Sequence, residues 1–178
     1  MTVAVAPAGS AIFSACGRYR YALTRKLAPW GRAVNFIMLN PSTADAETDD
    51  PTIRRCIGFA KAWGCATLIV TNLFAVRATD PKEMLAAADP VGPDNREHVE
   101  RAAELAFNIY AENFGEPHGL VVCAWGNHGA FMDQDLTTLG WIDHFKPKAL
   151  RVSKNGCPAH PLYLPASLTP FPYEGRKP

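Results

Sequence analysis

The sequence predicts an α/β protein in which a mainly parallel central sheet of about four strands has helices on both faces. Four short apolar runs lack the alternation of a half-exposed strand, as is typical of parallel strands covered on both sides. They comprise residues 34–39, 67–71, 120–124 and 149–152. Segments of helical periodicity separate these runs, and strands that alternate with helices indicate a three-layer sandwich.

Each interval between the predicted strands contains a predicted helix. The first begins at Pro51, after the N-cap pair Asp49 and Asp50, and its apolar stripe ends at Gly64. The second covers about residues 94–114, and the third covers about residues 130–145 and stops before Pro147.

The two ends of the chain lack this regular pattern. Aromatic and basic residues alternate within residues 12–27, so residues 1–30 are expected to form an N-terminal extension or a hairpin at the sheet edge. Residues 158–178 are rich in proline and are expected to form an irregular tail. A chain of 178 residues fits one domain, so residues 1–178 are expected to fold as a unit.

Composition favours a cytoplasmic protein without a metal or a cofactor. The net charge of +1 gives no electrostatic argument for nucleic acid as a partner. No run approaches the roughly 18 apolar residues of a membrane span, and no basic segment precedes the small apolar residues at the start. The five cysteines form no CxxC pair, so zinc and iron–sulfur sites are not indicated and reduced thiols are expected. We expect a monomer that does not bind membranes.

Polar, turn-forming residues follow each predicted strand. They occupy residues 39–45, 72–81, 125–129 and 155–163. Ligands of such sheets bind at the carboxyl ends of the strands, so these loops are expected to form one pocket.

These loops, in this order, resemble motifs of the uracil-DNA glycosylase superfamily. Leu39-Asn40-Pro41 is similar to the strand-end motif that holds the hydrolytic water, and Asn72, in VTNLFAVR, to the asparagine that reads the base. Trp125-Gly126 and His160-Pro161 are similar to a later turn and to the histidine motif. Four sequence segments also resemble those of an uncharacterised bacterial family: LNPSTAD, DDPTIRRC, NLFAVRATDP and HPLYL.

The chain departs from the superfamily pattern at three positions. Met38 stands where a glycine usually precedes the Asn-Pro pair, Thr52 stands where an aromatic residue would stack on the base, and Leu162 stands where a serine would contact DNA phosphates. A base-sized pocket is compatible with these changes, whereas they argue against flipping a base out of duplex DNA.

The resemblance implies a role for each candidate residue. Asn40 would hold the water and His160 would donate to the leaving base, while Asn72, Phe74 and Pro41 would bind the base. Asn40 and Asn72 are also ordinary turn residues, Phe74 an ordinary core residue, and His160 an ordinary residue of a proline-rich tail. Phosphate contacts or secondary roles are expected for seven residues: Arg54, Arg55, Arg77, Ser42, Asp45, Trp125 and His128.

An acidic stretch lies close to Asn40 in the sequence. Asp45, Asp49 and Asp50 would supply a carboxylate base or bind a cation, although helix capping also explains Asp49 and Asp50. We expect Asn40, Asn72 and His160 to converge on one cavity.

The leading hypothesis is a hydrolase that cleaves the N-glycosidic bond of uracil or a damaged base in nucleic acid, DNA rather than RNA, as in DNA repair. One alternative is a non-catalytic nucleic-acid or nucleotide-binding module that keeps the pocket. Another is a nucleoside- or nucleotide-processing enzyme, although the sequence has no GxxxxGK[ST] or GxGxxG phosphate loop.

Overall fold

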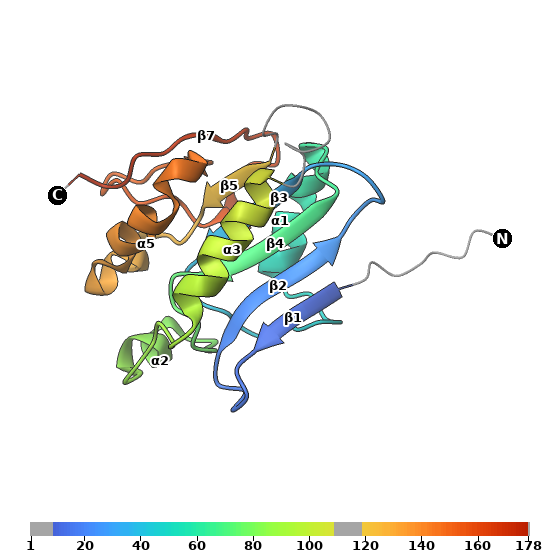
Figure 1. The fold of residues 1–178 in the computed structure, drawn as a ribbon. Helices are drawn as coiled ribbons and strands as arrows, with labels where there is room; N and C mark the ends of the chain where they lie inside the picture. The colour runs from blue at the N-terminus through green and yellow to red at the C-terminus, as the bar shows by residue number, and fades with distance from the viewer. Residues whose placement is uncertain (1–8, 109–118, 178) are drawn as a thin grey trace.

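The computed structural model describes residues 9–108 and 119–177, which form an α/β fold around one mixed sheet (Figure 1). The seven strands of this sheet lie in the order β1-β2-β4-β3-β5-β6-β7. They are β1 (Gly9–Phe13), β2 (Arg20–Lys26), β3 (Ala33–Met38), β4 (Thr67–Asn72), β5 (Leu120–Cys123), β6 (Lys148–Ala149) and β7 (Phe171–Pro172).

The four predicted strands are the parallel centre of this sheet, and the prediction of about four mainly parallel strands is wrong for the sheet as a whole. β4, β3, β5 and β6 are parallel neighbours, whereas β1 and β2 at one edge and β7 at the other pair antiparallel. Residues 12–27 contribute to a hairpin of β1 and β2, and the tail contributes β7. Antiparallel edge strands carry polar residues on one side, so their sequences show no continuous apolar run.

Helices cover both faces of the sheet, and the alternating side chains of the strands separate two apolar clusters. One cluster joins Val34, Phe36 and Met38 of β3 to the buried side of α1 (Pro51–Ala62). On the other face, Ile37 packs in a cluster with residues of α3 (Asn95–Asn108) and α5 (Gln134–Ile142). In Figure 1, α3 lies in front of the sheet and α1 behind it.

The first predicted helix agrees with α1. Asp50 is its N-cap and accepts a hydrogen bond from the Ile53 amide at 2.8 Å, while Gly64 follows the helix with a φ of +70°. The second predicted helix is α3 as far as Asn108, and residues 109–114 of that prediction lie outside the described residues. Sequence patterning missed α2 (Pro81–Ala86), although Asp80 caps it and Pro81 is its first residue.

The third predicted helix, over about residues 130–145, is interrupted. A 3₁₀ segment covers Asn127–Asp133 and ends in a kink, where Met132 has a φ of +58° and Asp133 a φ of +51°. The α-helix α5 follows, and a second 3₁₀ turn covers Asp143–Phe145. Another short 3₁₀ turn, Pro161–Tyr163, lies in the proline-rich tail. Apolar spacing continues through the kink, so periodicity alone did not locate it. No helix of the described residues is long and apolar enough to cross a membrane.

Candidate functional site

A cavity of about 600 Å³ lies at the carboxyl ends of β3, β4 and β5. Its wall includes Asn40 after β3, Asn72 at the end of β4, and Trp125 after β5. His160, from the tail, also lines it. The structure therefore brings together Asn40, Asn72 and His160, which come from three separate segments of the chain.

The pleat of the sheet decides which face the cavity occupies. Val70 and Asn72 are two residues apart on β4, so their side chains point to the same face. Val70 packs in the cluster that contains α1, and both residues line the cavity together with Thr52 and Ile53 of α1. The cavity thus lies between the strand ends and the N-terminus of α1.

Asn72 is the most unusual residue of this wall. It is 1 % exposed, and neither its Nδ2 nor its Oδ1 atom has a hydrogen-bond partner among the described residues. A buried carboxamide without partners is destabilising, because both groups have lost their hydrogen bonds to water. The Asn72 amide is held ready to donate one hydrogen bond and accept another, which fits the edge of a polar heterocycle.

The orientation of Asn40 is fixed by its own amide group. Its Nδ2 donates to the carbonyl oxygens of Ala78, at 2.8 Å, and Pro41, at 3.1 Å. Oδ1 is consequently the atom left to accept a hydrogen bond from a ligand or a water molecule. A neutral amide oxygen can orient water, but it cannot take a proton from it at neutral pH.

His160 is set up as a neutral hydrogen-bond donor. Its Nδ1 accepts the backbone N–H of Leu162 at 3.3 Å, so in the neutral ring the proton resides on Nε2. His160 is exposed at one side, but partial desolvation of the ring where it lines the cavity lowers its pKa below the ordinary value, while the negative charge of Asp50 acts in the opposite direction.

Arg20, at the start of β2, is a cavity residue that the sequence patterns did not identify. The residue is 2 % exposed, and its Nη1 donates to the Ala44 carbonyl oxygen at 2.7 Å. Its Nε has no partner among the described residues. Burial lowers the pKa of Arg20 to about 10, so the guanidinium stays charged at neutral pH. The contacts of Arg20 are with residues distant in sequence: its backbone N–H donates to the carbonyl oxygen of Ala75 and its guanidinium to that of Ala44, and local sequence does not encode these contacts.

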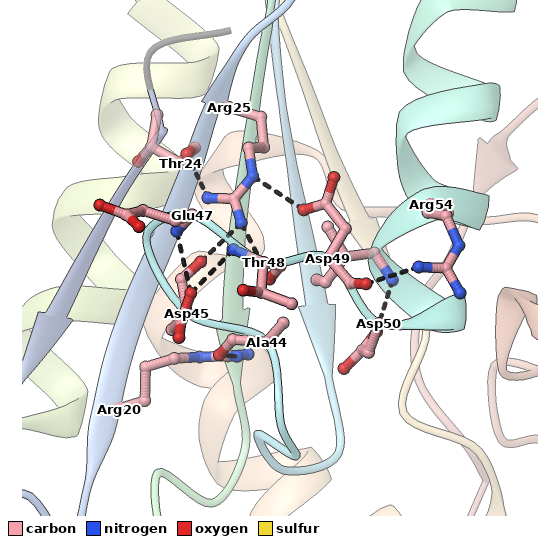
Figure 2. A network of polar contacts seen from close by, with 11 residues as sticks. Arg20, Thr24, Arg25, Ala44, Asp45, Glu47, Thr48, Asp49, Asp50 and Arg54 are labelled. Atoms are coloured by element: carbon pink, nitrogen blue, oxygen red, sulfur yellow. Dashed lines mark hydrogen bonds and ion pairs between the residues drawn. The ribbon is translucent and has the colours of Figure 1, made fainter. Parts of the chain in front are cut away.

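Asp50 also lines the cavity, from the N-cap position of α1. Arg25 of β2 holds the loop that leads to it (Figure 2). The Arg25 Nε donates to Asp49 at 2.9 Å, and its Nη2 donates to the carbonyl oxygen of Asp45 at 2.6 Å. Arg54, on the first turn of α1, donates to the Asp49 carbonyl oxygen. The start of α1, and Asp50 with it, is therefore fixed relative to the sheet.

The model of a known family covers most of this chain. The family is described as "Protein of unknown function (DUF1643)", and its model matches residues 20–162. The chain belongs to the DUF1643 family. A search of curated proteins and a search of solved structures gave no match.

The DUF1643 match includes the whole cavity wall. Arg20 and His160 are the first and last cavity residues along the chain, and both lie within residues 20–162. Ser42, Trp125 and His128, for which phosphate contacts or secondary roles are expected, also line the cavity. Trp125 is fully buried and rests against Gly129, where an added Cβ would lie 2.1 Å from the indole ring.

Two expected base-binding residues of this DUF1643 protein are outside the cavity wall. Phe74 is fully buried in the cluster on the opposite face of the sheet, where its ring lies 5.8 Å from that of Phe131. The expectation that it stacks on a base is wrong, because the residue lies two positions beyond the strand end and faces the core. Pro41 is buried, and its carbonyl oxygen accepts from the Ala78 amide.

Four expected charged contacts are also outside the cavity wall. Asp45 binds the amides of its own turn, and these hydrogen bonds lower its pKa. Arg77 donates to the Gly17 carbonyl oxygen and lies over the ring of Phe13. Arg54 and Arg55 lie on α1 without lining the cavity. The structure therefore does not place these four side chains with Asn40 and Asn72.

The described residues contain no group of three or more His, Cys, Asp or Glu side chains that would hold a metal ion. The polar atoms of the cavity wall are instead amides, one guanidinium, one carboxylate, imidazoles, hydroxyls and an indole. Such a wall suits a neutral polar ligand.

Proposed function

We propose that this DUF1643 protein is a hydrolase of the uracil-DNA glycosylase type, which holds a nucleobase in the cavity and cleaves its N-glycosidic bond in nucleic acid. The observation that carries the proposal is the buried Asn72 amide, whose donor and acceptor are both without a protein partner on the cavity wall. The hydrogen-bonding edge of uracil presents a complementary donor and acceptor.

The neighbouring side chains support the same chemistry. Cleavage of an N-glycosidic bond develops positive charge on the sugar and negative charge on the departing base. His160, which is neutral and carries its proton on Nε2, suits donation to an oxygen of that base. Asn40 Oδ1 suits orientation of the water.

The test is a base-release assay on the full chain. Single- and double-stranded oligonucleotides that contain uracil, hypoxanthine or an oxidised pyrimidine are incubated with the protein and then treated with alkali, which breaks the strand at abasic sites. Cleavage by the wild type is expected, with a loss of at least about 100-fold for His160→Gln and Asn72→Leu. Asn155→Ala, at an exposed loop position outside this cavity, is the control that retains activity. Absence of abasic sites with every substrate would refute the proposal.

The alternative of a non-catalytic binding module has one observation in its favour. The residue at the water-holding position, Asn40, is an amide whose Nδ2 is already bound to Ala78, so it is not a general base. A binding module would retain the same oligonucleotides without releasing a base, and added salt would weaken that retention. Saturable binding of a free nucleoside without nucleic-acid binding would instead support a nucleoside-processing enzyme.

A further inference from the structure

The cavity contains two side chains that are charged at neutral pH, and they have opposite signs. Among its lining residues Asp50 is the only carboxylate and Arg20 the only permanent cation. None of the ion pairs among the described residues includes Arg20, and burial of a guanidinium without a carboxylate in direct contact is costly. Because the two charges cancel, the wall favours a neutral ligand rather than an anionic one such as free phosphate. It also suits a ligand whose reaction separates charge.

We propose that Asp50 is the general base of this site and that Arg20 stabilises the departing base; this inference rests on the hydrolase function proposed above. A carboxylate has two oxygens, and Asp50 uses Oδ1 to cap α1 at 2.8 Å from the Ile53 amide. Oδ2 is therefore the oxygen that takes a proton. Asn40, whose amide cannot act as a base, only orients the water.

The step balances without any further reactant. Asp50 removes a proton from water, and the oxygen of that water forms a bond to the anomeric carbon of the sugar. The C–N bond breaks, and its electron pair stays on the base, where Arg20 and the Nε2 proton of His160 stabilise the negative charge. The proton taken by Asp50 returns through solvent to the base nitrogen, so the products are a hydroxylated sugar and the neutral base.

Asp50→Asn separates this role from helix capping. Asparagine is as good an N-cap as aspartate, so the variant is expected to keep α1 while losing the base. The matched control is Asp80→Asn, because Asp80 is also a helix N-cap, accepting from the Lys82 amide at the start of α2, and does not line the cavity. For the best oligonucleotide substrate we expect a kcat at least about 100-fold lower for Asp50→Asn, with an unchanged KM, and wild-type kinetics for Asp80→Asn.

A rescue experiment distinguishes a base from a merely structural carboxylate. Asp50→Ser also keeps an N-cap and leaves room in the cavity for a small carboxylate. Added sodium formate is therefore expected to raise the kcat of this variant at least tenfold. If the wild type releases base and the kcat of Asp50→Asn is within threefold of the wild-type value, this inference is overturned and the hydrolase function is retained. An equal effect of Asp80→Asn, or no rescue by formate, also overturns it. A wild type that releases no base overturns both.

Discussion

Replacement of Asn72 by leucine is expected to stabilise the protein while it removes ligand binding. The side chain is 1 % exposed and both of its amide atoms lack a partner among the described residues. Leucine has nearly the same shape and needs no hydrogen bonds, so the unfavourable burial of two polar groups disappears. A residue that serves only the fold would show the opposite effect, because its replacement would break contacts.

The size of this effect follows from the two unpartnered atoms. A buried polar group without a hydrogen bond costs about 1–3 kcal/mol, and water that enters the cavity offsets part of that cost. The expected increase in the free energy of unfolding is therefore about 1–2 kcal/mol. For a chain of this length, each kcal/mol corresponds to about 2–4 °C, so Tm is expected to rise by roughly 2–8 °C.

Asn95 provides a matched control in the same region. It is also fully buried and its Oδ1 likewise has no partner among the described residues, but its Nδ2 donates to the backbone carbonyl oxygens of Asn72, at 2.9 Å, and Leu73, at 3.0 Å. Asn95→Leu leaves both carbonyl groups without this donor, so the free energy of unfolding is expected to fall by about 2 kcal/mol or more. Urea denaturation and calorimetry of the two variants measure both changes. A fall in Tm for Asn72→Leu similar to that for Asn95→Leu would refute the reasoning.

Three further outcomes are expected. Gly129→Ala should lower the free energy of unfolding by about 1–3 kcal/mol, because the added Cβ overlaps the buried indole. Gly140→Ala, with no atom within 4 Å of its added Cβ, should instead raise it by about 0.5–1 kcal/mol. Equal urea midpoints for the two variants would contradict this. His160 should titrate by NMR below the ordinary histidine range, since partial desolvation at the cavity lowers its pKa. Stability should then fall as the pH drops below about 6.5, where the unfolded chain takes up a proton that the folded chain does not, and a normal or raised pKa would contradict this. Of the five free cysteines only Cys16 is exposed, and its hydrogen bond with Ser14 lowers its pKa. Ellman's reagent should therefore react with one thiol in the folded protein and with all five in urea. Ser14→Ala should slow the reaction of the folded protein.

The centre of the fold was predictable because local sequence encodes it. The runs that became β3, β4 and β5 are apolar on both faces, and α1 carries a capping aspartate, a following proline and a terminal glycine. The bounds and pairing of the edge strands were not predicted, since polar residues interrupt their apolar pattern. The kink at Met132 depends on a left-handed backbone conformation at non-glycine residues, so no glycine or proline in the sequence indicates it.

The candidate site was predictable where its residues directly follow a strand. Asn40, Asn72 and Trp125 line the cavity because parallel strands end at one edge of the sheet. Phe74 lies only two residues beyond Asn72, yet it faces the opposite cluster, and sequence distance does not reveal that reversal. Arg20 comes from an antiparallel strand, and its guanidinium contacts the loop after β3 through the carbonyl oxygen of Ala44.

Asp50 shows why an assignment to the fold does not exclude a role in the site. Capping explains one carboxylate oxygen and the position of the residue, and the second oxygen remains for chemistry. The contacts that fix α1, from Arg25 to the loop at Asp49 and from Arg54 to the same loop, also fix Asp50 before any ligand binds. A carboxylate held in this way needs no ordering when a ligand binds, so less of the binding energy goes into positioning it. The stability gained by the cap and the preorganisation of the cavity therefore arise from the same few hydrogen bonds, and a variant that loosens this loop should lose both together.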